Sequence, residues 1–421
     1  MSDSRGIYEP APPEPLAAPT DPGKRLELVD ALRGFALFGI LVVNLSDFTL
    51  HWGLSAEQLA VLSTAGTDES AQFLIRMFGI GKFNTIFSFL FGLGFAMFMA
   101  RGTQGDAAFL PFYRRRLSVL LLIGAVHMVF IWYGDIVALY AALGFVLILF
   151  RRLSDHALLL WAAVLIFSHP VLTAVIVVSG GALDPGEPLR GLEVWLFTSV
   201  FGFPADSYYA VASSGAWFDV LKYNLAGPPY RVGEMLSSSR FQRVLGMFLV
   251  GMWAGRHMIF RNPAAHRRLF KRLLIWGLPL GLAGNALYAA MMPETEPSIG
   301  RDLVYALGVV PLAMSYVAAF SLLWLRPRTR RVLAVLAPAG RAALTVYLSQ
   351  TLICIALFYG IGLGFGGQVG PTLFFPIAVA IFAAQVLMSA MWLRHFRFGP
   401  VEWLWRSLTY GRREPLARRN A

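Results

Sequence analysis

The feature that most constrains the fold is a series of apolar runs separated by short polar connections. A helix needs about 20 mostly apolar residues to cross the hydrocarbon core of a bilayer. Ten runs approach or exceed that length: 28–50, 73–99, 117–133, 135–150, 157–178, 241–260, 272–292, 303–325, 333–359 and 372–393. Charged residues make up only 14% of the chain, whereas soluble domains average about 25%. The sequence therefore predicts an all-α polytopic membrane protein of about ten transmembrane helices.

The distribution of basic residues predicts the topology. Arginine and lysine cluster in every second connection: 24–25, 101–116, 151–152, 256–272, 326–331 and 394–413. The alternate connections are acidic, mixed or neutral. Because basic connections stay in the cytoplasm, we expect both termini to be cytoplasmic. The net charge of +12 follows this pattern and forms no single stripe or tail, so it does not indicate a nucleic-acid partner.

The chain divides into three segments. Residues 1–23 form a proline-rich tail that we expect to be disordered, 24–411 form a single transmembrane domain, and 412–421 form a basic tail. One external connection is long, at about 180–240, and is rich in tryptophan and tyrosine, which suit a membrane interface. It is either an ordinary loop or contains two short interfacial or re-entrant helices, 190–203 and 216–225.

The first apolar run carries a row of polar residues. Arg33 and Asn44 are eleven residues apart, which places them on one helical face about 16 Å apart along the axis. His51 falls near the same face if the helix continues, and Asp30 is a local partner for Arg33. Ionisable groups inside a span are costly and are candidates for function. The alternative is that Arg33 reaches the inner surface and Asn44 bonds to a neighbouring helix.

Three further ionisable residues lie in or beside the second and third runs. Lys82 is in the second, His127 is in the third, and Asp135 follows the third. Asp135 could pair with His127 or neutralise Lys82. Because His127 and Asp135 are eight residues apart, direct contact requires the chain to turn back after Tyr133. A buried structural histidine is the alternative.

The ninth run carries Arg341, Thr345 and Ser349 at steps of four, which predicts one polar helical face. Hydrogen bonding between helices is the favoured explanation for these residues except Arg341. The sequence lacks the common metal-binding and nucleotide-binding motifs, and its single cysteine, Cys354, lies in an apolar run. We therefore expect no metal ion.

Five segments resemble the YeiB-like family of bacterial membrane proteins, a group defined by a domain of unknown function. They are LVDALRGFALFGILVVNL, KFNTIFSFLFGLG, GAVHMVFIWYGDIVALYAALG, GRAALTVYLSQTLICIALFYGIGL and FRFGPVEWLWRSLTYG. The resemblance runs from about 24 to 411. It implies a multi-pass protein of the bacterial cytoplasmic (inner) membrane.

The first of these segments also resembles the wider transmembrane acyltransferase superfamily, which includes heparan-α-glucosaminide N-acetyltransferase. Its bacterial glycan acyltransferases carry Arg, ten residues and then His. Here the arginine is Arg33, but Asn44 occupies the histidine position. The glucosaminide acetyltransferase pattern has Arg, ten residues, Asn and then a catalytic His, which Arg33, Asn44 and His51 resemble with a shorter final spacing.

The resemblance implies transfer of an acyl group from cytoplasmic acyl-CoA, with acetyl-CoA as the expected donor, to an external acceptor of unspecified chemistry. Cationic side chains would hold the CoA phosphates, asparagine the thioester carbonyl, and histidine would act as a base oriented by a carboxylate. The implied donor-binding residues are Arg33, Lys82 and Arg341, and the implied catalytic residues are His127, Asp135, Asn44 and His51.

Two other classes of function fit the same residues. A transporter or exporter of a small molecule or lipid-linked substrate also needs many helices and buried charges. A non-catalytic scaffold predicts that Arg33, Asn44 and His127 do not converge. Membrane lipids are partners in every case, and the sequence leaves a homo-oligomer open.

Overall fold

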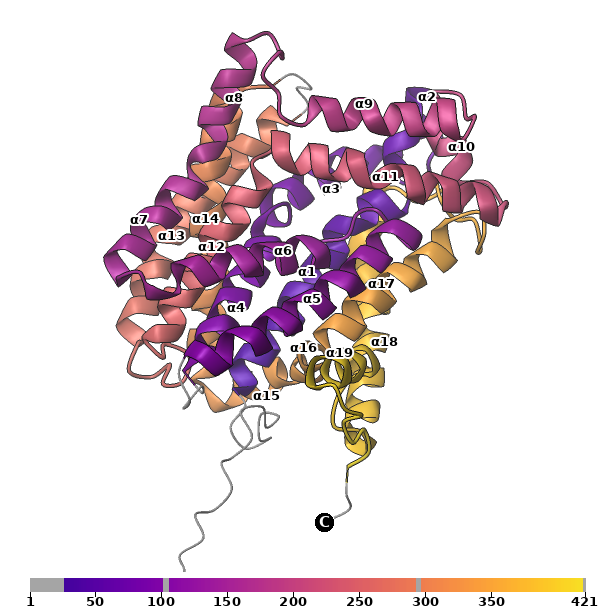
Figure 1. Ribbon diagram of the computed structural model, residues 1–421. Coiled ribbons are helices and arrows are strands. Elements are labelled where there is room, and N and C mark those ends of the chain that lie inside the picture. The colour runs from indigo at the N-terminus through magenta and orange to yellow at the C-terminus, as the bar shows by residue number, and fades with distance from the viewer. Residues whose placement is uncertain (1–25, 101–105, 293–296, 419–421) are drawn as a thin grey trace, which may run out of the picture.

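The computed structural model describes residues 26–100, 106–292 and 297–418 (Figure 1). Within these ranges the chain is built of helices and their connections, with one isolated antiparallel bridge between Phe396 and Ala417. The predicted disordered tail, 1–23, lies outside the described residues. The prediction of an all-α protein is confirmed.

The helices follow one another along the described residues. Their bounds are α1 (Glu27–Phe48), α2 (Ala56–Ala60), α3 (Ala65–Phe78), α4 (Lys82–Met99), α5 (Asp106–Phe130), α6 (Val137–Leu147), α7 (Asp155–Ile166), α8 (Ser168–Val178), α9 (Glu187–Trp195), α10 (Tyr208–Ala212), α11 (Trp217–Ser237), α12 (Arg240–Arg256), α13 (Arg267–Met291), α14 (Ile299–Trp324), α15 (Pro327–Ala334), α16 (Ala337–Arg341), α17 (Ala343–Phe358), α18 (Phe374–His395) and α19 (Pro400–Tyr410).

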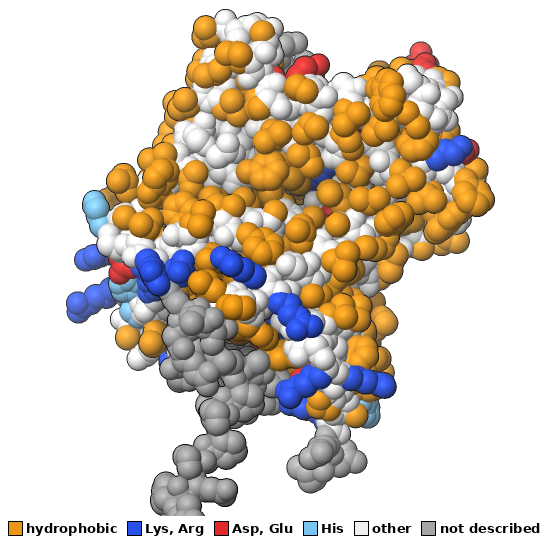
Figure 2. Space-filling view, in the orientation of Figure 1, with side chains coloured by type: hydrophobic (Ala, Val, Ile, Leu, Met, Phe, Trp, Pro, Cys, Tyr) orange, Lys and Arg blue, Asp and Glu red, His pale blue; other side chains and the backbone are white. Residues whose placement is uncertain are grey.

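Six helical stretches in the described ranges are long and apolar enough to cross a bilayer. They are Glu27–Gly53, Ala65–Met99, Asp155–Val178, Arg267–Met291, Ile299–Trp324 and Pro371–His395. Apolar side chains cover most of the side of the molecule in Figure 2, and the basic side chains visible there gather mainly toward its lower part. A broad apolar surface of this kind suits lipid, so the protein is a multi-pass membrane protein.

Three of the predicted runs are interrupted. The run 157–178 breaks at Phe167, before Pro170, which has no N–H to donate. The run 73–99 breaks between α3 and α4, where Gly81 has a φ of +83°. Lys82 is therefore the first residue of α4 and does not lie within one long helix.

The run 333–359 is divided into α15, α16 and α17. Arg341 ends α16, and Ala342 leaves the helical region with φ −106° and ψ +38°. The predicted single face of Arg341, Thr345 and Ser349 is therefore wrong. The break lets α16 press against α1, where a Cβ on Gly340 would lie 1.7 Å from the carbonyl oxygen of Asp30.

The segment 180–240 folds into helices. Figure 1 shows α9 and α11 lying across the upper end of the bundle. The predicted helix 190–203 corresponds to α9 and a π-turn that ends at Val200, and the predicted helix 216–225 is the first part of the longer α11. The ordinary-loop alternative is therefore wrong.

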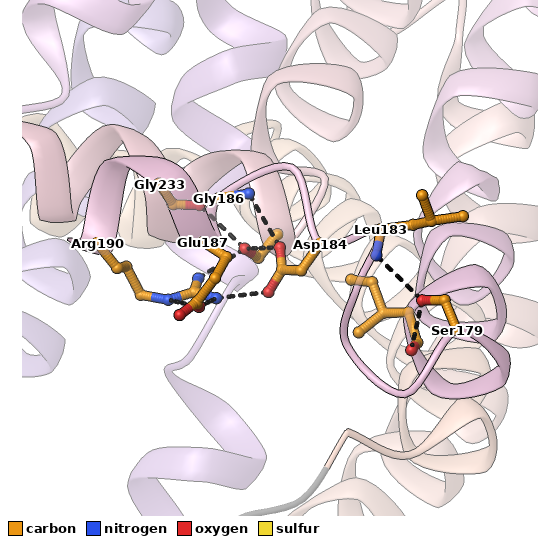
Figure 3. A network of polar contacts seen from close by, with 9 residues as sticks. Ser179, Leu183, Asp184, Gly186, Glu187, Arg190 and Gly233 are labelled. Atoms are coloured by element: carbon orange, nitrogen blue, oxygen red, sulfur yellow. Dashed lines mark hydrogen bonds and ion pairs between the residues drawn. The ribbon is translucent and has the colours of Figure 1, made fainter. Parts of the chain in front are cut away.

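A polar network attaches α9 to α11 (Figure 3). Arg190 donates to Asp184 at 2.5 Å, to Glu187 at 2.6 Å and to Ser237 at 2.8 Å. The Ser237 hydroxyl in turn donates to Asp184 at 2.5 Å. Gly186 lies so close to Gly233 that a Cβ on it would meet the Gly233 carbonyl oxygen at 2.2 Å. These contacts join the two helices into one layer.

Candidate active site

His127 and Asp135 form a buried pair at the turn between α5 and α6. The His127 Nδ1 and the Asp135 Oδ2 lie 2.8 Å apart, and each residue is 1% exposed. The chain turns back after Tyr133, as direct contact requires. Asp135 Oδ1 also accepts from the backbone N–H of Ala138 at 2.7 Å, which caps the first turn of α6. Of the two partners considered for Asp135, the structure places His127 in contact.

The other ring nitrogen of His127 faces α17. Its Nε2 lies 3.1 Å from the Thr351 hydroxyl oxygen, and its ring centre lies 5.7 Å from that of Tyr347. Tyr347 accepts a hydrogen bond from the backbone N–H of Ile136 at 3.3 Å. Since the Asp135 carboxylate accepts a hydrogen bond from Nδ1–H, Nε2 carries the lone pair that accepts from the Thr351 hydroxyl. This tautomer is the one a general base requires.

A cavity of about 340 Å³ lies on the opposite side of Tyr347. Four arginines line it, from α1, α5, α16 and α19: Arg33, Arg116, Arg341 and Arg406. Much of the remaining wall is apolar, and its lining also includes Ile136 and Tyr347. Ligand pockets commonly have volumes of about 300–1,000 Å³, apolar walls and a few placed polar groups. The cavity therefore suits a ligand with an anionic head and an apolar arm.

The arginines in this cavity are held by specific contacts. Arg33 bonds to Asp30 at 2.8 Å, as expected from their spacing, and the Arg116 guanidinium lies 3.7 Å from the ring centre of Trp405. Burial, and then the positive charge of Arg116, lowers the pKa of Arg406 to about 10, so the Arg406 guanidinium stays charged at neutral pH. Charged guanidinium groups in apolar surroundings bind phosphate oxygens strongly.

The sequence indicated only part of this cavity. Arg33 and Arg341 were expected to bind a donor, and both line it. Arg116 belongs to a basic cluster that the sequence explains by topology alone. Arg406 lies in FRFGPVEWLWRSLTYG, and this family segment forms α19, which lines the cavity through Arg406 and Trp405. Thr351 was also missed, because its sequence neighbours are those of any apolar helix.

Five of the predicted site residues do not line this cavity: Asn44, His51, Lys82, His127 and Asp135. Asn44 is half-buried on α1, one turn beyond the lining residue Ile40. Lys82 is fully buried, and its amino group donates to the Arg76 carbonyl at 2.8 Å, at the end of α3. Of Arg33, Asn44, Lys82, His127 and Asp135, only Arg33 lines this cavity.

The expected row from Arg33 to His51 also ends early. Helix α1 stops at Phe48, and Leu50 has a left-handed φ of +55°. This turn takes His51 out of the helical register. His51 is half-buried in a short 3₁₀ turn, with its ring 6.1 Å from that of Phe374.

A cluster of charged residues contacts the turn that carries Asp135. Arg231 donates to the Gly134 carbonyl at 3.3 Å and to Glu234 at 3.1 Å, and Arg240 donates to Glu234 at 3.0 Å. Asp47, an exposed carboxylate near the end of α1, interacts electrostatically with these three residues. Figure 2 shows a hollow below the position of α11 in which basic and acidic atoms are visible.

The fold and these groups define a polytopic helical membrane protein with a buried His–Asp pair, an arginine-lined cavity that Tyr347 joins to this pair, and a polar cluster bonded to the turn that carries Asp135. Residues 254–412 match the family described as "Protein of unknown function (DUF418)".

Two similar proteins extend the match over most of the chain. "Uncharacterized protein YxaH" of Bacillus subtilis (strain 168) is 34% identical, over 95% of this chain and 98% of its own length. "Uncharacterized protein YeiB" of Escherichia coli (strain K12) is 28% identical, over 90% of this chain and 95% of its own length. The chain belongs to the YeiB-like family.

Proposed function

We propose that this protein transfers an acyl group from cytoplasmic acyl-CoA to an acceptor at the external face of the bacterial inner membrane. One observation carries the proposal. Tyr347 and Ile136 line the arginine-rich cavity, and they also adjoin the His127–Asp135 pair. A donor held by its phosphates among the arginines would therefore direct its acyl arm toward a histidine in the base tautomer.

The roles follow from the chemistry of each group. Arg33, Arg116, Arg341 and Arg406 hold the CoA phosphates, because bidentate guanidinium groups match phosphate oxygens. His127 accepts the proton that is lost by the nucleophile, and Asp135 holds the imidazole in orientation. Asn44, one turn beyond the cavity on α1, is the candidate donor to the thioester carbonyl oxygen. The buried position of Lys82 against α3 makes it a structural residue in this proposal.

In this proposal the acceptor binds at the external cluster, which consists of Asp47, Arg231, Glu234 and Arg240. Asp47 has an exposed carboxylate beside the Arg231–Glu234–Arg240 network, which is anchored to the same turn as Asp135. Carboxylates and guanidinium groups bind hydroxyl-bearing and amine-bearing molecules, and these are the nucleophiles that acyl transfer requires. Donor and acceptor would approach the His–Asp pair from opposite sides.

The proposal includes the finer topology. We propose ten transmembrane segments, with both termini in the cytoplasm, from the alternation of basic connections. The four arginines of the cavity then lie near the cytoplasmic surface, where CoA is available. The layer formed by α9 and α11 then lies at the external interface.

The test uses purified protein in phospholipid nanodiscs with radiolabelled acetyl-CoA. Arg341→Ala should weaken acetyl-CoA binding about tenfold to a hundredfold, because hydrogen bonds to charged groups contribute about 1.5–3 kcal/mol. Arg328→Ala, at an exposed arginine outside the cavity, is the matched control. Equal binding by both variants and the natural protein would contradict the donor site.

Transfer itself separates the two histidines. In vesicles of bacterial lipid, His127→Ala should abolish transfer of the label with the fold intact, and His51→Ala should only reduce it. The opposite ranking would assign catalysis to His51. If neither change reduces transfer while acetyl-CoA still binds, histidine catalysis is refuted.

A further inference from the structure

We infer that Thr351 is the nucleophile that first receives the acyl group, so that transfer proceeds through an acyl-threonine intermediate. The inference rests on the proposed function, and it adds a covalent step that acyl transfer does not by itself require. The alternative role for Thr351 is to position His127 by a hydrogen bond. Three features of the structure favour the covalent role.

The first feature is the order of the three groups. The Thr351 Oγ1 lies 3.1 Å from His127 Nε2, and His127 Nδ1 lies 2.8 Å from Asp135 Oδ2. A nucleophile activated by a base that is oriented by a third group has this arrangement, with hydrogen bonds of about 2.6–3.2 Å. Thr351 and Asp135 are each 1% exposed, so water competes little for the acyl group.

The second feature is the direction of the hydroxyl group. Threonine and serine hydroxyls inside helices commonly bond to the carbonyl four residues earlier. Thr49 bonds in this way to Leu45 at 2.7 Å, and Thr409 to Trp405 at 2.7 Å. The Thr351 hydroxyl instead bonds to the imidazole of another helix. Its proton is therefore directed at a base.

The third feature is the position of Thr351 along α17. Ala343, Leu344 and Tyr347 of this helix line the arginine-rich cavity. Thr351 is one turn further along the same face, about 6 Å from Tyr347 along the axis. An acyl group that passes the Tyr347 side chain therefore meets the Thr351 hydroxyl next, between the donor cavity and the turn that carries the external cluster.

Both chemical steps balance without a further reagent. In the first, Thr351 Oγ1 bonds to the acyl carbon, its proton moves to His127 Nε2, the thioester C–S bond breaks, and the departing sulfur takes the proton as CoA thiol. In the second, an acceptor hydroxyl or amine attacks the acyl carbon and loses its proton to His127 Nε2. The ester C–O bond then breaks, and the proton returns to Oγ1.

The test is an acceptor-free reaction of the purified protein with labelled acetyl-CoA in synthetic phosphatidylcholine nanodiscs, followed by acid quench, proteolysis and mass spectrometry. We expect one acetyl group on the α17 peptide of the natural protein and of Thr351→Ser, and none on Thr351→Val. Thr351→Val should still bind acetyl-CoA and should lose at least about a hundredfold in transfer. Thr49→Val, a buried threonine that serves its own helix, should keep the adduct and the activity.

Two results would overturn the inference while leaving the proposed function intact. One is near-normal transfer by Thr351→Val. The other is loss of transfer in Thr351→Val when neither the natural protein nor Thr351→Ser forms an adduct on α17, which would assign Thr351 to positioning His127. A natural protein that neither binds nor cleaves acetyl-CoA would instead refute the proposed function itself.

Discussion

Replacing Glu402 should release the start of α17 from α19 beside the arginine-lined cavity. Glu402 belongs to α19 and is 9% exposed, and its carboxylate reaches the first turn of α17. It accepts from the backbone N–H of Leu344 at 2.6 Å, the backbone N–H of Thr345 at 3.1 Å and the Thr345 hydroxyl at 2.6 Å. The N–H groups of a first helical turn have no partner within their own helix, so Glu402 acts as a cap supplied by another helix.

The magnitude follows from the three hydrogen bonds. Each hydrogen bond to a charged group contributes about 1.5–3 kcal/mol, but water in the cavity can replace part of it once the side chain is gone. We therefore expect Glu402→Ala to lower the free energy of opening α17 by about 2–4 kcal/mol. At 1.4 kcal/mol per factor of ten, the open population rises about thirtyfold to several hundredfold. Glu402→Gln keeps one acceptor oxygen and should show about half of this change in free energy.

Cys354 provides the assay. It is the only cysteine of the chain, it lies on α17, and it is 0% exposed, so a maleimide reaches it only when α17 opens. The labelling rate at limiting reagent therefore follows the open population. Glu57→Ala, at an exposed glutamate on α2, is the control. Equal labelling rates for Glu402→Ala and this control would refute the capping role of Glu402.

Three further predictions test the topology, the packing and the buried lysine. Reporter fusions after Gly181 should read external and fusions after Arg328 cytoplasmic, and a cytoplasmic reading at Gly181 would break the proposed topology. Gly340→Ala should lower the thermal unfolding temperature markedly because its Cβ would overlap the backbone of α1, whereas Gly191→Ala, with open space around it, should not. Lys82→Met should lower stability but retain acyl transfer, because the Lys82 amino group donates to the Arg76 carbonyl near the end of α3. Normal stability with loss of transfer would instead assign Lys82 a role in function.

The sequence predicted the helical class, and it indicated His127 as one of two candidate partners for Asp135, for clear physical reasons. Apolar runs of sufficient length form helices in any bilayer, because every backbone polar group must be satisfied within the segment. His127 and Asp135 were identifiable because a titratable group in an apolar run is costly and requires a partner. Their contact depended on a turn after Tyr133, and the structure has this turn.

The prediction of one polar face in the ninth run was wrong because tertiary packing overrides helical periodicity there. Arg341 was placed on one face with Thr345 because no sequence rule requires a break at Ala342. That break is explained by the close approach of Gly340 to α1. Thr351 and Arg116 were missed for a different reason: each acquires its meaning from residues more than 200 positions away, His127 and Trp405 respectively. Contacts of that separation leave no local pattern in a single sequence.

Tyr347 lines the arginine-rich cavity and packs against His127. The packing around it bears on the choice between a transferase and a transporter. A transporter must move its whole substrate past the barrier between its two sides, which needs a path as wide as the substrate. The barrier here contains the packed pair of His127 and Asp135, each 1% exposed, and the rings of Phe48 and Trp132, which pack at a tilt with their centres 4.3 Å apart. An acyl relay needs only a few atoms to pass one side chain, over one turn of α17. A rotamer change of Tyr347 is a smaller event than separation of α1, α5 and α17, so the packing of this barrier favours transfer of a small group over passage of a whole molecule.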